Sequence, residues 1–292
     1  MNITAFQALA CPLDGKPLQR VAATWRCANG HAFDVASQGY ANLLPVQYKR
    51  SRDPGDSKEM VVVRRRFLNS GAYQPIAEAV SHAVLAGLPA TASCLDAGCG
   101  EGYYLRQLSA AAADMRQRLA IVGVDISKWA VLAAAKQDRR PAWLVGSNAK
   151  LPVQSATLDR VLCLFGFPAY AEFARVIKPG GQLLLVDPGP DHLRELRQVI
   201  YPTLKPERHS TPTVPAGFSP LPGQTVRFSF ALDGAEPIAD LLAMTPHLHR
   251  ASAEGRARAA ALTALELTAD VRLTLYARDD GRGQATNVIF PN

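Results

Sequence analysis

The chain has 292 residues, of which 48% are hydrophobic and 20% charged, which is enough apolar material for the core of a globular protein. No stretch approaches the ~20 apolar residues that span a bilayer, and the first ten residues have neither the basic leader nor the apolar length of a signal peptide. The five cysteines, an odd number, argue against a disulfide framework. We therefore expect a cytoplasmic protein with no membrane partner.

The net charge of +7 is concentrated near the N-terminus. Residues 1–70 contain ten Lys and Arg against five Asp and Glu, a net charge of +5. A localised positive field suits a polyanion such as nucleic acid. A solvated basic surface without a partner explains the charge equally well.

A set of possible metal ligands lies between residues 11 and 31. Their spacing, C-x2-D-x12-C-x3-H, is similar to that of a zinc knuckle in which aspartate replaces one cysteine; the four residues are Cys11, Asp14, Cys27 and His31. Ligands paired on two turns can close a tetrahedron around Zn²⁺ and stabilise a segment too small to have its own core. A tight turn at Asp14 without metal is the alternative. We predict a structural zinc-binding and RNA-recognition module over residues 1–45.

Residues 46–70 are predicted to form a charged loop and a linker helix that runs from Ser57 to Leu68. Clustered basic residues beside an aromatic ring are typical of loops that contact phosphate and a base. The candidate RNA-binding residues are Lys49, Arg50, Arg52 and Arg65. An ordinary amphipathic linker would need no such partner.

A glycine-rich loop is the most informative motif, and it lies in the predicted catalytic domain, residues 71–292. An apolar run ends at Asp96 and continues into G-x-G-x-G, formed by Gly98, Gly100 and Gly102, before a predicted helix. Glycines let the backbone turn sharply and approach a ligand, and the helix start offers unpaired N–H groups. A dinucleotide site would have G-x-G-x-x-G instead. The spacing favours S-adenosylmethionine, with Asp96 orienting the loop or a nearby ammonium group.

Polar residues follow the next two predicted strands. Asp125 comes 23 residues after Gly102, where an acid commonly binds both ribose hydroxyls of an adenosine, and Asn148 can face the adenine ring. Further strands are predicted at residues 158–164, 182–186, 225–231 and 268–276, with helices at 172–176, 237–244 and 256–265. This order predicts the α/β class, with a Rossmann-like sheet of seven strands whose last pair is antiparallel.

No general base stands out in the sequence. Asp159 and Asp53 are weak candidates, because Asp159 could equally cap its strand and Asp53 could equally fix the turn of its loop. Phe165 and Phe167 follow the fourth strand, where they could stack on a substrate base or pack in the core.

Together these motifs resemble the bacterial 23S rRNA guanine-N1 methyltransferases, a family of class I S-adenosylmethionine-dependent enzymes. The resemblance covers nearly the whole chain and is carried by residues 11–13, Cys27 with His31, residues 49–56, 96–104 and 188–193. It implies an N-terminal zinc module and methylation of N1 of one guanine in a domain II hairpin of 23S rRNA. It also implies cofactor contacts at Tyr73, Gly100, Glu101 and His192, and places Asp14 where the family has a cysteine ligand.

Two other functions are compatible with the sequence. A small-molecule methyltransferase, acting for example on a quinone or lipid precursor, would share everything from Asp96 to Gly181 but would have no use for residues 11–66. A non-catalytic RNA-binding protein is disfavoured by the complete set of cofactor residues. A homodimer would form a wider RNA-binding cleft.

Overall fold

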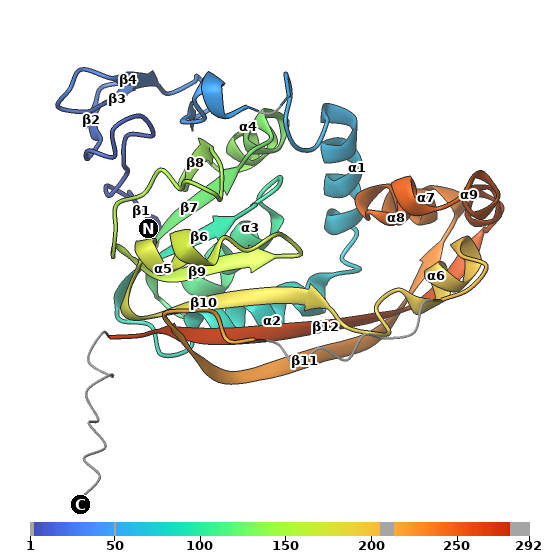
Figure 1. Cartoon of the computed structure of the whole chain (residues 1–292). Helices are drawn as coiled ribbons and strands as arrows, with labels where there is room; N and C mark the ends of the chain where they lie inside the picture. The colour runs from blue at the N-terminus through green and yellow to red at the C-terminus, as the bar shows by residue number, and fades with distance from the viewer. Residues whose placement is uncertain (1–2, 50, 205–212, 281–292) are drawn as a thin grey trace, which may run out of the picture.

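The computed structural model describes residues 3–49, 51–204 and 213–280, and its centre is one large mixed sheet (Figure 1). The strand order is β11-β12-β10-β9-β6-β7-β8-β5, and β1 pairs separately with the start of β7. All neighbours from β5 to β10 are parallel, whereas β12 is antiparallel to both β10 and β11. The strands are β1 (Ile3–Thr4), β5 (Tyr40–Asn42), β6 (Thr91–Ala97), β7 (Arg118–Asp125), β8 (Ala142–Val145), β9 (Leu158–Leu164), β10 (Ile177–Pro188), β11 (Phe218–Asp233) and β12 (Ala264–Arg278).

The predicted seven strands are β6 to β12, and the sheet has two more because the N-terminal part of the chain adds β1 and β5. The register pairs Tyr40 with Trp143 and Asn42 with Val145, so β5 continues the catalytic sheet beyond β8. The three residues of β5 are too few to show a strand pattern in the sequence. The predicted boundary at residue 45 therefore does not coincide with a break in the sheet.

Two apolar layers cover the two faces of the sheet. On one face lie α2 (Gln74–Leu85), α3 (Tyr103–Asp114) and α4 (Lys128–Gln137), whose buried side chains form one core cluster. On the other face, α5 (Tyr170–Val176) packs together with the N-terminal segment, because Phe6, Leu9 and Phe173 belong to the same second cluster. The N-terminal segment thus covers a face of the catalytic sheet.

The zinc-binding sequence forms a small ribbon, which lies at the top left of Figure 1 beside β8. It is a three-stranded antiparallel sheet of β2 (Gln19–Val21), β3 (Thr24–Arg26) and β4 (Ala32–Asp34). A short 3-10 helix (Val46–Tyr48) and the charged loop connect it to α1 (Lys58–Asn69). We refer to residues 3–45, which include the ribbon, β1 and β5, as the head.

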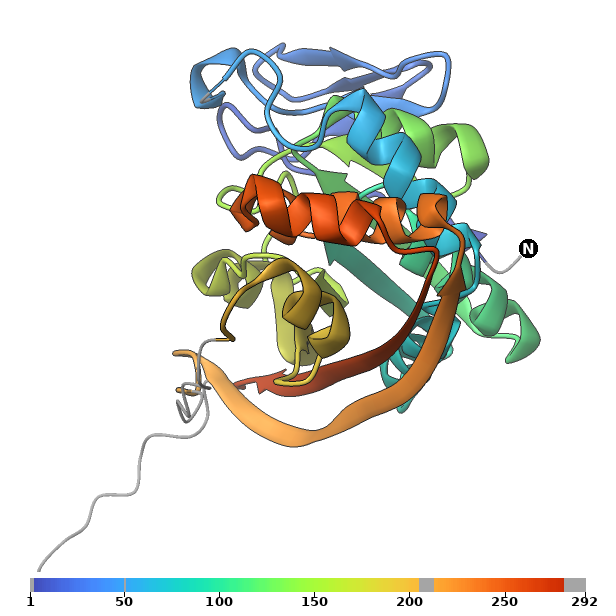
Figure 2. The same cartoon turned by 90° about the vertical axis from the view of Figure 1, so that its right-hand side faces the viewer.

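The C-terminal part of the chain forms a long β11–β12 pair and a group of short helices, which face α1 in Figure 2. Arg66 on α1 pairs with Asp240 and with Glu236, the latter at 2.6 Å. The short helices are α6 (Arg194–Ile200), α7 (Ala235–Met244), α8 (His247–Arg250) and α9 (Ala253–Ala260). The helix predicted for residues 256–265 ends at Ala260, since β12 begins at Ala264. Among the described residues, no helix has the length and apolar character to cross a membrane.

Candidate functional site

The glycine-rich loop connects β6 to α3 at the edge where the parallel strands end. Gly98, Gly100 and Gly102 all have positive φ, which other residues rarely adopt. The backbone N–H groups of Gly98 and Cys99 both donate to the Val124 carbonyl, at 2.8 and 3.0 Å. The loop is therefore fixed to the end of β7, with Gly98 exposed and Gly100 half-buried.

Gly102 is also required by packing inside the protein. A Cβ on Gly102 would lie 2.6 Å from the ring of Trp143 and 3.1 Å from Ala134, so the packing inside the protein leaves no room for a side chain at this position. Gly123 is under the same constraint, because a Cβ added to it would lie 2.4 Å from the same tryptophan ring. Trp143 is 1% exposed and supports the loop from below.

Asp125 holds the loop to the start of α4. Its Oδ2 accepts from the Gly100 N–H at 2.9 Å and its Oδ1 from the Ser127 N–H at 2.8 Å. Burial raises the pKa of its carboxyl group, and these two hydrogen bonds oppose that rise. Asn148 lies on the other side of the loop, with its Nδ2 3.9 Å from the position of a Cβ on Gly98. Asp125 and Asn148 thus both lie beside the glycine-rich loop, and their contacts with an adenosine stay a prediction.

Asp96 is the buried acid of this edge. Its Oδ1 has no hydrogen-bond partner among the described residues, and burial, with a smaller contribution from Asp125, raises its pKa to about 8. An unpaired buried carboxylate oxygen is costly unless a cation or donor is supplied. S-adenosylmethionine carries an ammonium and a sulfonium group, so this acid fits the cationic part of that cofactor.

Glu101 faces the interior of the protein. Its carboxylate is 0% exposed and pairs with Arg106 at 3.0 Å and with Gln137 at 2.7 Å. The side chain therefore braces the loop against α3 and α4, and the Glu101 carbonyl accepts from the same two residues, at 2.7 Å from Arg106 and 3.3 Å from Gln137.

A polar and aromatic cluster forms the second side of the site. The Tyr73 hydroxyl lies 3.2 Å from His192 Nε2, and His192 Nδ1 accepts from the Asp270 N–H at 3.2 Å. Burial lowers the pKa of His192 to about 4, so the ring is neutral. Since Nδ1 accepts, Nε2 carries the hydrogen and donates to the Tyr73 oxygen. The Tyr73 hydroxyl hydrogen is therefore not directed at His192.

Phe165, which the sequence left open between base stacking and core packing, completes this cluster. Its ring stacks on His192 with centroids 6.0 Å apart and planes at 27°. Its φ is +52°, a strained conformation for a bulky residue that is typical of functional sites. Asp270, on β12, was missed: its Oδ2 accepts from the Asp191 N–H at 3.0 Å and so fixes the loop that carries His192. No sequence signal connects residues so far apart.

Replacing His192 with phenylalanine should change how stability depends on pH. The pKa of His192 is about 4 in the folded chain and near 6.5 when unfolded, so the unfolded state binds more protons between these values. Stability contributed by the neutral ring is present above pH 6.5 and lost as the pH falls towards 4. The melting temperature of the wild type should therefore fall more steeply from pH 7 to pH 4 than that of His192→Phe. Parallel curves would contradict this; the exposed His249→Phe is the control.

Asp159, a weak candidate for the general base, lies far from the glycine-rich loop. It lies at the start of β9, at the opposite end of the sheet from the glycine-rich loop. Both its oxygens bind Lys178 Nζ, at 2.8 and 2.9 Å, and Oδ2 also accepts from the Ser93 N–H at 2.8 Å. Asp159 therefore has a structural role: it connects the first residues of β9 to Ser93 on β6 and to Lys178 on β10. Asp53 is exposed in the charged loop.

The charged loop lies against the start of α4. The Asp56 carbonyl accepts from the Ser127 hydroxyl at 2.6 Å, and a Cβ on Gly55 would lie 2.9 Å from Ile126. The Asp56 carboxylate pairs with Arg64 at 2.8 Å, and Arg64 Cδ would lie 3.8 Å from a Cβ on Gly100. Arg64 was not predicted as a site residue, although it covers the cofactor loop.

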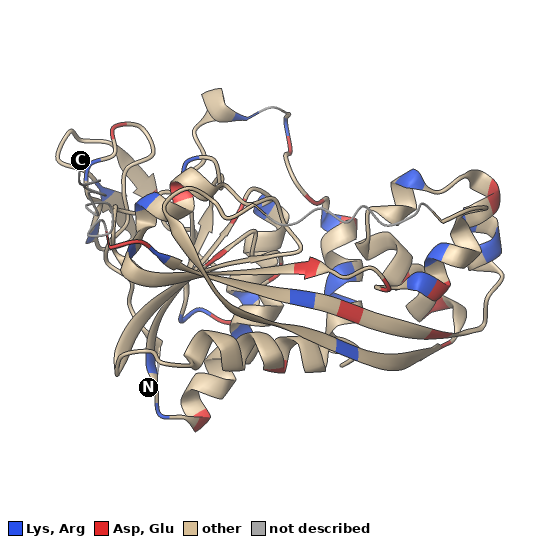
Figure 3. Cartoon of the chain, turned by 60° about the horizontal axis from the view of Figure 1, so that its bottom comes forward, with Lys and Arg blue, Asp and Glu red and all other residues tan. Residues whose placement is uncertain are grey.

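The predicted RNA-binding residues remain available to a partner. Arg52 and Arg65 are exposed, Lys49 is half-buried, and none of the three forms an ion pair with a described residue. Arg50 lies outside the described residues. Figure 3 shows Lys and Arg, with Asp and Glu among them, on α1 and on the short C-terminal helices as well as in the head.

The four predicted metal ligands converge on one point. Their ligand atoms all lie within 4.8 Å of one another, at 3.5 Å for Cys11 Sγ to His31 Nδ1, 3.4 Å for Cys27 Sγ to both His31 Nδ1 and Asp14 Oδ2, and 3.1 Å for His31 Nδ1 to Asp14 Oδ2. A tetrahedron with ordinary Zn–S, Zn–N and Zn–O bonds has ligand separations of about 3.5 Å for S to N and about 3.3 Å for N to O. The geometry therefore fits Zn²⁺ with aspartate as the fourth ligand.

Comparison with known proteins agrees with this construction. The family described as "RlmA, N-terminal", a zinc ribbon, matches residues 9–52, and the family "Methyltransferase domain" matches residues 95–185. A protein of Micromonospora griseorubida, named as a putative 23S rRNA (guanine-N(1)-)-methyltransferase, is 32% identical to this chain. The match covers 92% of this chain and 96% of the Micromonospora protein. The 23S rRNA (guanine(748)-N(1))-methyltransferase of Streptomyces fradiae is 36% identical over 67% of this chain and 69% of its own.

A further relative matches a smaller part of the chain. The ubiquinone/menaquinone biosynthesis C-methyltransferase of Syntrophotalea carbinolica is 34% identical over 32% of this chain and 42% of its own. The fold and the site therefore define an S-adenosylmethionine-dependent methyltransferase with a zinc ribbon. The chain belongs to the family of 23S rRNA guanine-N1 methyltransferases.

Proposed function

We propose that this chain transfers the methyl group of S-adenosylmethionine to N1 of one guanine in a hairpin of domain II of 23S rRNA. The observation that carries this proposal is the head, which is folded onto the catalytic sheet through β1 and β5. Residues 1–70, which include the head, the charged loop and α1, carry a net charge of +5, and this positive charge built onto a methyltransferase suits a large anionic substrate. The name of the Streptomyces relative supports the same chemistry at a single guanine.

The arrangement around β9 suits an extruded base. S-adenosylmethionine supplies an electrophilic methyl group, so the chain must place N1 in line with it and accept the N1 proton. A paired guanine must leave the helical stack to reach such a site. Phe165 and Phe167, at the carboxyl end of β9, are 39% and 92% exposed and so do not pack in the core. The Phe167 ring, together with the part of Phe165 that is not stacked on His192, can contact the base.

Replacing Phe167 with alanine should lower the catalytic efficiency on RNA by about 1–3 kcal/mol, the usual value of one base–aromatic stack, or about 5- to 150-fold. Cofactor affinity should not change. The measurement is kcat/KM for methyl transfer together with calorimetric binding of S-adenosylmethionine. Met115→Ala, which removes an equally large exposed apolar side chain at the end of α3, is the matched control. Equal efficiencies for both variants would exclude Phe167 from base binding.

The alternative is a small-molecule methyltransferase, favoured by the match to the quinone-pathway relative over 32% of the chain. The decisive experiment is transfer of labelled methyl groups to 23S rRNA that lacks its natural modifications, followed by primer extension. A stop at one domain II guanine is expected, since methylated N1 blocks pairing. No transfer to RNA, despite tight cofactor binding, would favour the small-molecule enzyme.

The proposal includes cytoplasmic action on 23S rRNA and a pair of subunits, since two chains would form a wider cleft for a hairpin. Light scattering should give about twice the 31.4 kDa of one chain. A measured mass equal to that of one chain, both with and without RNA, would show that the protein does not dimerise.

A further inference from the structure

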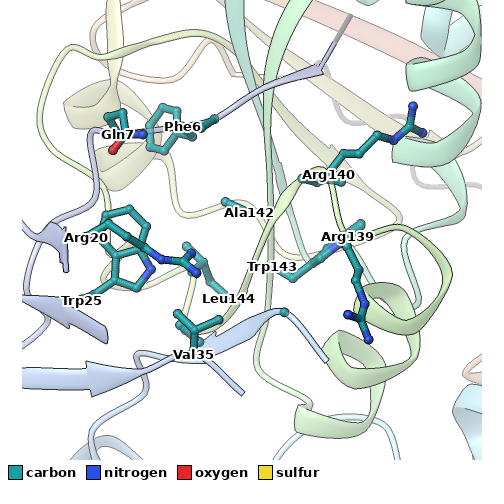
Figure 4. Close-up of a pocket in the computed structure, with 14 residues that line it drawn as sticks. Phe6, Gln7, Arg20, Trp25, Val35, Arg139, Arg140, Ala142, Trp143 and Leu144 are labelled. Carbon is teal, nitrogen blue, oxygen red and sulfur yellow. The ribbon is translucent and has the colours of Figure 1, made fainter. Parts of the chain in front are cut away.

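A cavity of about 400 Å³ lies between the head and the edge of the catalytic sheet, away from the cofactor edge (Figure 4). Phe6, Arg20 and Trp25 of the head line one side. Arg139 and Arg140, which precede β8, line the other side together with Ala142. The volume is in the range of pockets that hold one small ligand.

The charge of this cavity is positive. Its lining within the described chain contains three arginines and no carboxylate. Arg140 is neutralised by Asp138, which it contacts at 2.7 Å. Arg139 forms no ion pair or hydrogen bond with a described residue, and Arg20 donates only to the Ala22 carbonyl, at 3.0 Å. Arg20 and Arg139, which both line the cavity, therefore have no carboxylate partner among the described residues, and an anion in the cavity can neutralise them.

The shape of the cavity suits a flat ring beside that anion. The Arg20 guanidinium lies over the Trp25 ring at 5.7 Å and reaches across the cavity in Figure 4. Trp25 and Phe6 are 5% and 6% exposed, so they form a fixed apolar wall. Guanidinium planes and aromatic walls are surfaces on which unpaired RNA bases stack.

The position of the cavity relates it to the charged loop. β5 and β8 run side by side from the cavity to the cofactor edge, and the chain then continues from Asn42 towards Lys49 and Arg52. Three strand residues span about 10 Å. One extended RNA strand can therefore contact the cavity and the charged loop together.

We propose that this cavity receives one unpaired nucleotide of the substrate RNA, outside the guanine that is methylated. Arg139 contacts its phosphate, and its base stacks on the Arg20 guanidinium against Trp25. This inference rests on the proposed function, because it takes the substrate to be RNA. The head then recognises the hairpin through a built pocket as well as through its surface charge.

The test uses the full-length protein and an unmodified domain II hairpin RNA. Arg139→Ala should weaken RNA binding about five- to tenfold and make the dependence of log K on log salt shallower by about one unit. Arg116→Ala, an exposed arginine at the end of α3, is the matched control. Ala142→Leu should weaken binding without changing charge, since it narrows the cavity. Melting temperatures show whether each variant is folded, and kcat at saturating RNA should not change.

Each outcome decides one question. Wild-type protein that methylates the hairpin while Arg139→Ala binds it unchanged would overturn the role of the cavity and leave the proposed function intact. Equal losses for Arg139→Ala and Arg116→Ala, or no loss for folded Ala142→Leu, would show general surface charge and also overturn it. Wild-type protein that neither binds nor methylates RNA would remove the proposed function itself.

Discussion

Replacing Asp96 with asparagine is expected to weaken S-adenosylmethionine binding by about 3–5 kcal/mol, more than 100-fold in Kd, because it leaves a buried cation without its partner. The carboxyl group is 1% exposed and its Oδ1 has no partner among the described residues. Since its pKa is raised to about 8, cofactor binding at pH 7 should release a proton. Calorimetry in two buffers of different ionisation enthalpy measures both the affinity and the proton.

Without cofactor, Asp96→Asn should become more stable relative to the wild type as the pH rises. The folded chain holds the Asp96 proton up to about pH 8 and the unfolded chain only to about 3.8, so stability of the wild type falls with pH in this window. The melting temperature of Asp96→Asn minus that of the wild type should therefore increase from pH 4 to pH 8. Asp114→Asn, an exposed acid on α3, is the control. Unchanged affinity and no proton release would show that another group faces the cationic part of the cofactor.

Replacing His31 with alanine is expected to abolish stoichiometric zinc binding and unfold the ribbon. Structural zinc contributes about 10–16 kcal/mol to the folding of small domains, far more than the packing of this half-exposed ring. Zinc content by atomic emission should fall from one ion per chain to none. Trp25, which is 5% exposed, should become exposed and shift its fluorescence to the red. RNA methylation should be lost, whereas cofactor affinity should stay within about twofold.

The matched control is His249→Ala, which removes an exposed imidazole from α8, outside the cluster. It should keep one zinc ion per chain and the wild-type melting temperature. If His31→Ala also kept both, the turn at Asp14 would be stable without metal and the ribbon would fold by packing alone.

The local motifs of this chain were predictable from sequence. The two-turn spacing of Cys11 to His31, the glycine-rich loop and Asp125 lie in short segments whose residue types dictate the backbone, and the structure brings each set together. The α/β class and the antiparallel pairing of the last two strands were also predictable, because parallel strands linked by helices have few possible arrangements.

Contacts between distant segments were not predictable. The Lys178 ion pair of Asp159, the hold of Asp270 on the loop before His192, and the packing of Trp143 under Gly102 depend on tertiary structure alone. The sequence does not show whether a glycine leaves room for a ligand or for a neighbouring tryptophan ring. An exposed Phe165 likewise cannot be distinguished by sequence from a core residue.

The pairing of β5 with β8 has a consequence for the behaviour of the protein at high concentration. Without β5, the backbone N–H and C=O groups on the outer side of β8 would be open, and an open strand edge is a template for another chain. The head closes this edge, and the zinc cluster lies next to it in sequence. Loss of metal in the cell would therefore promote aggregation as well as loss of activity, which makes the ribbon a safeguard against misassembly.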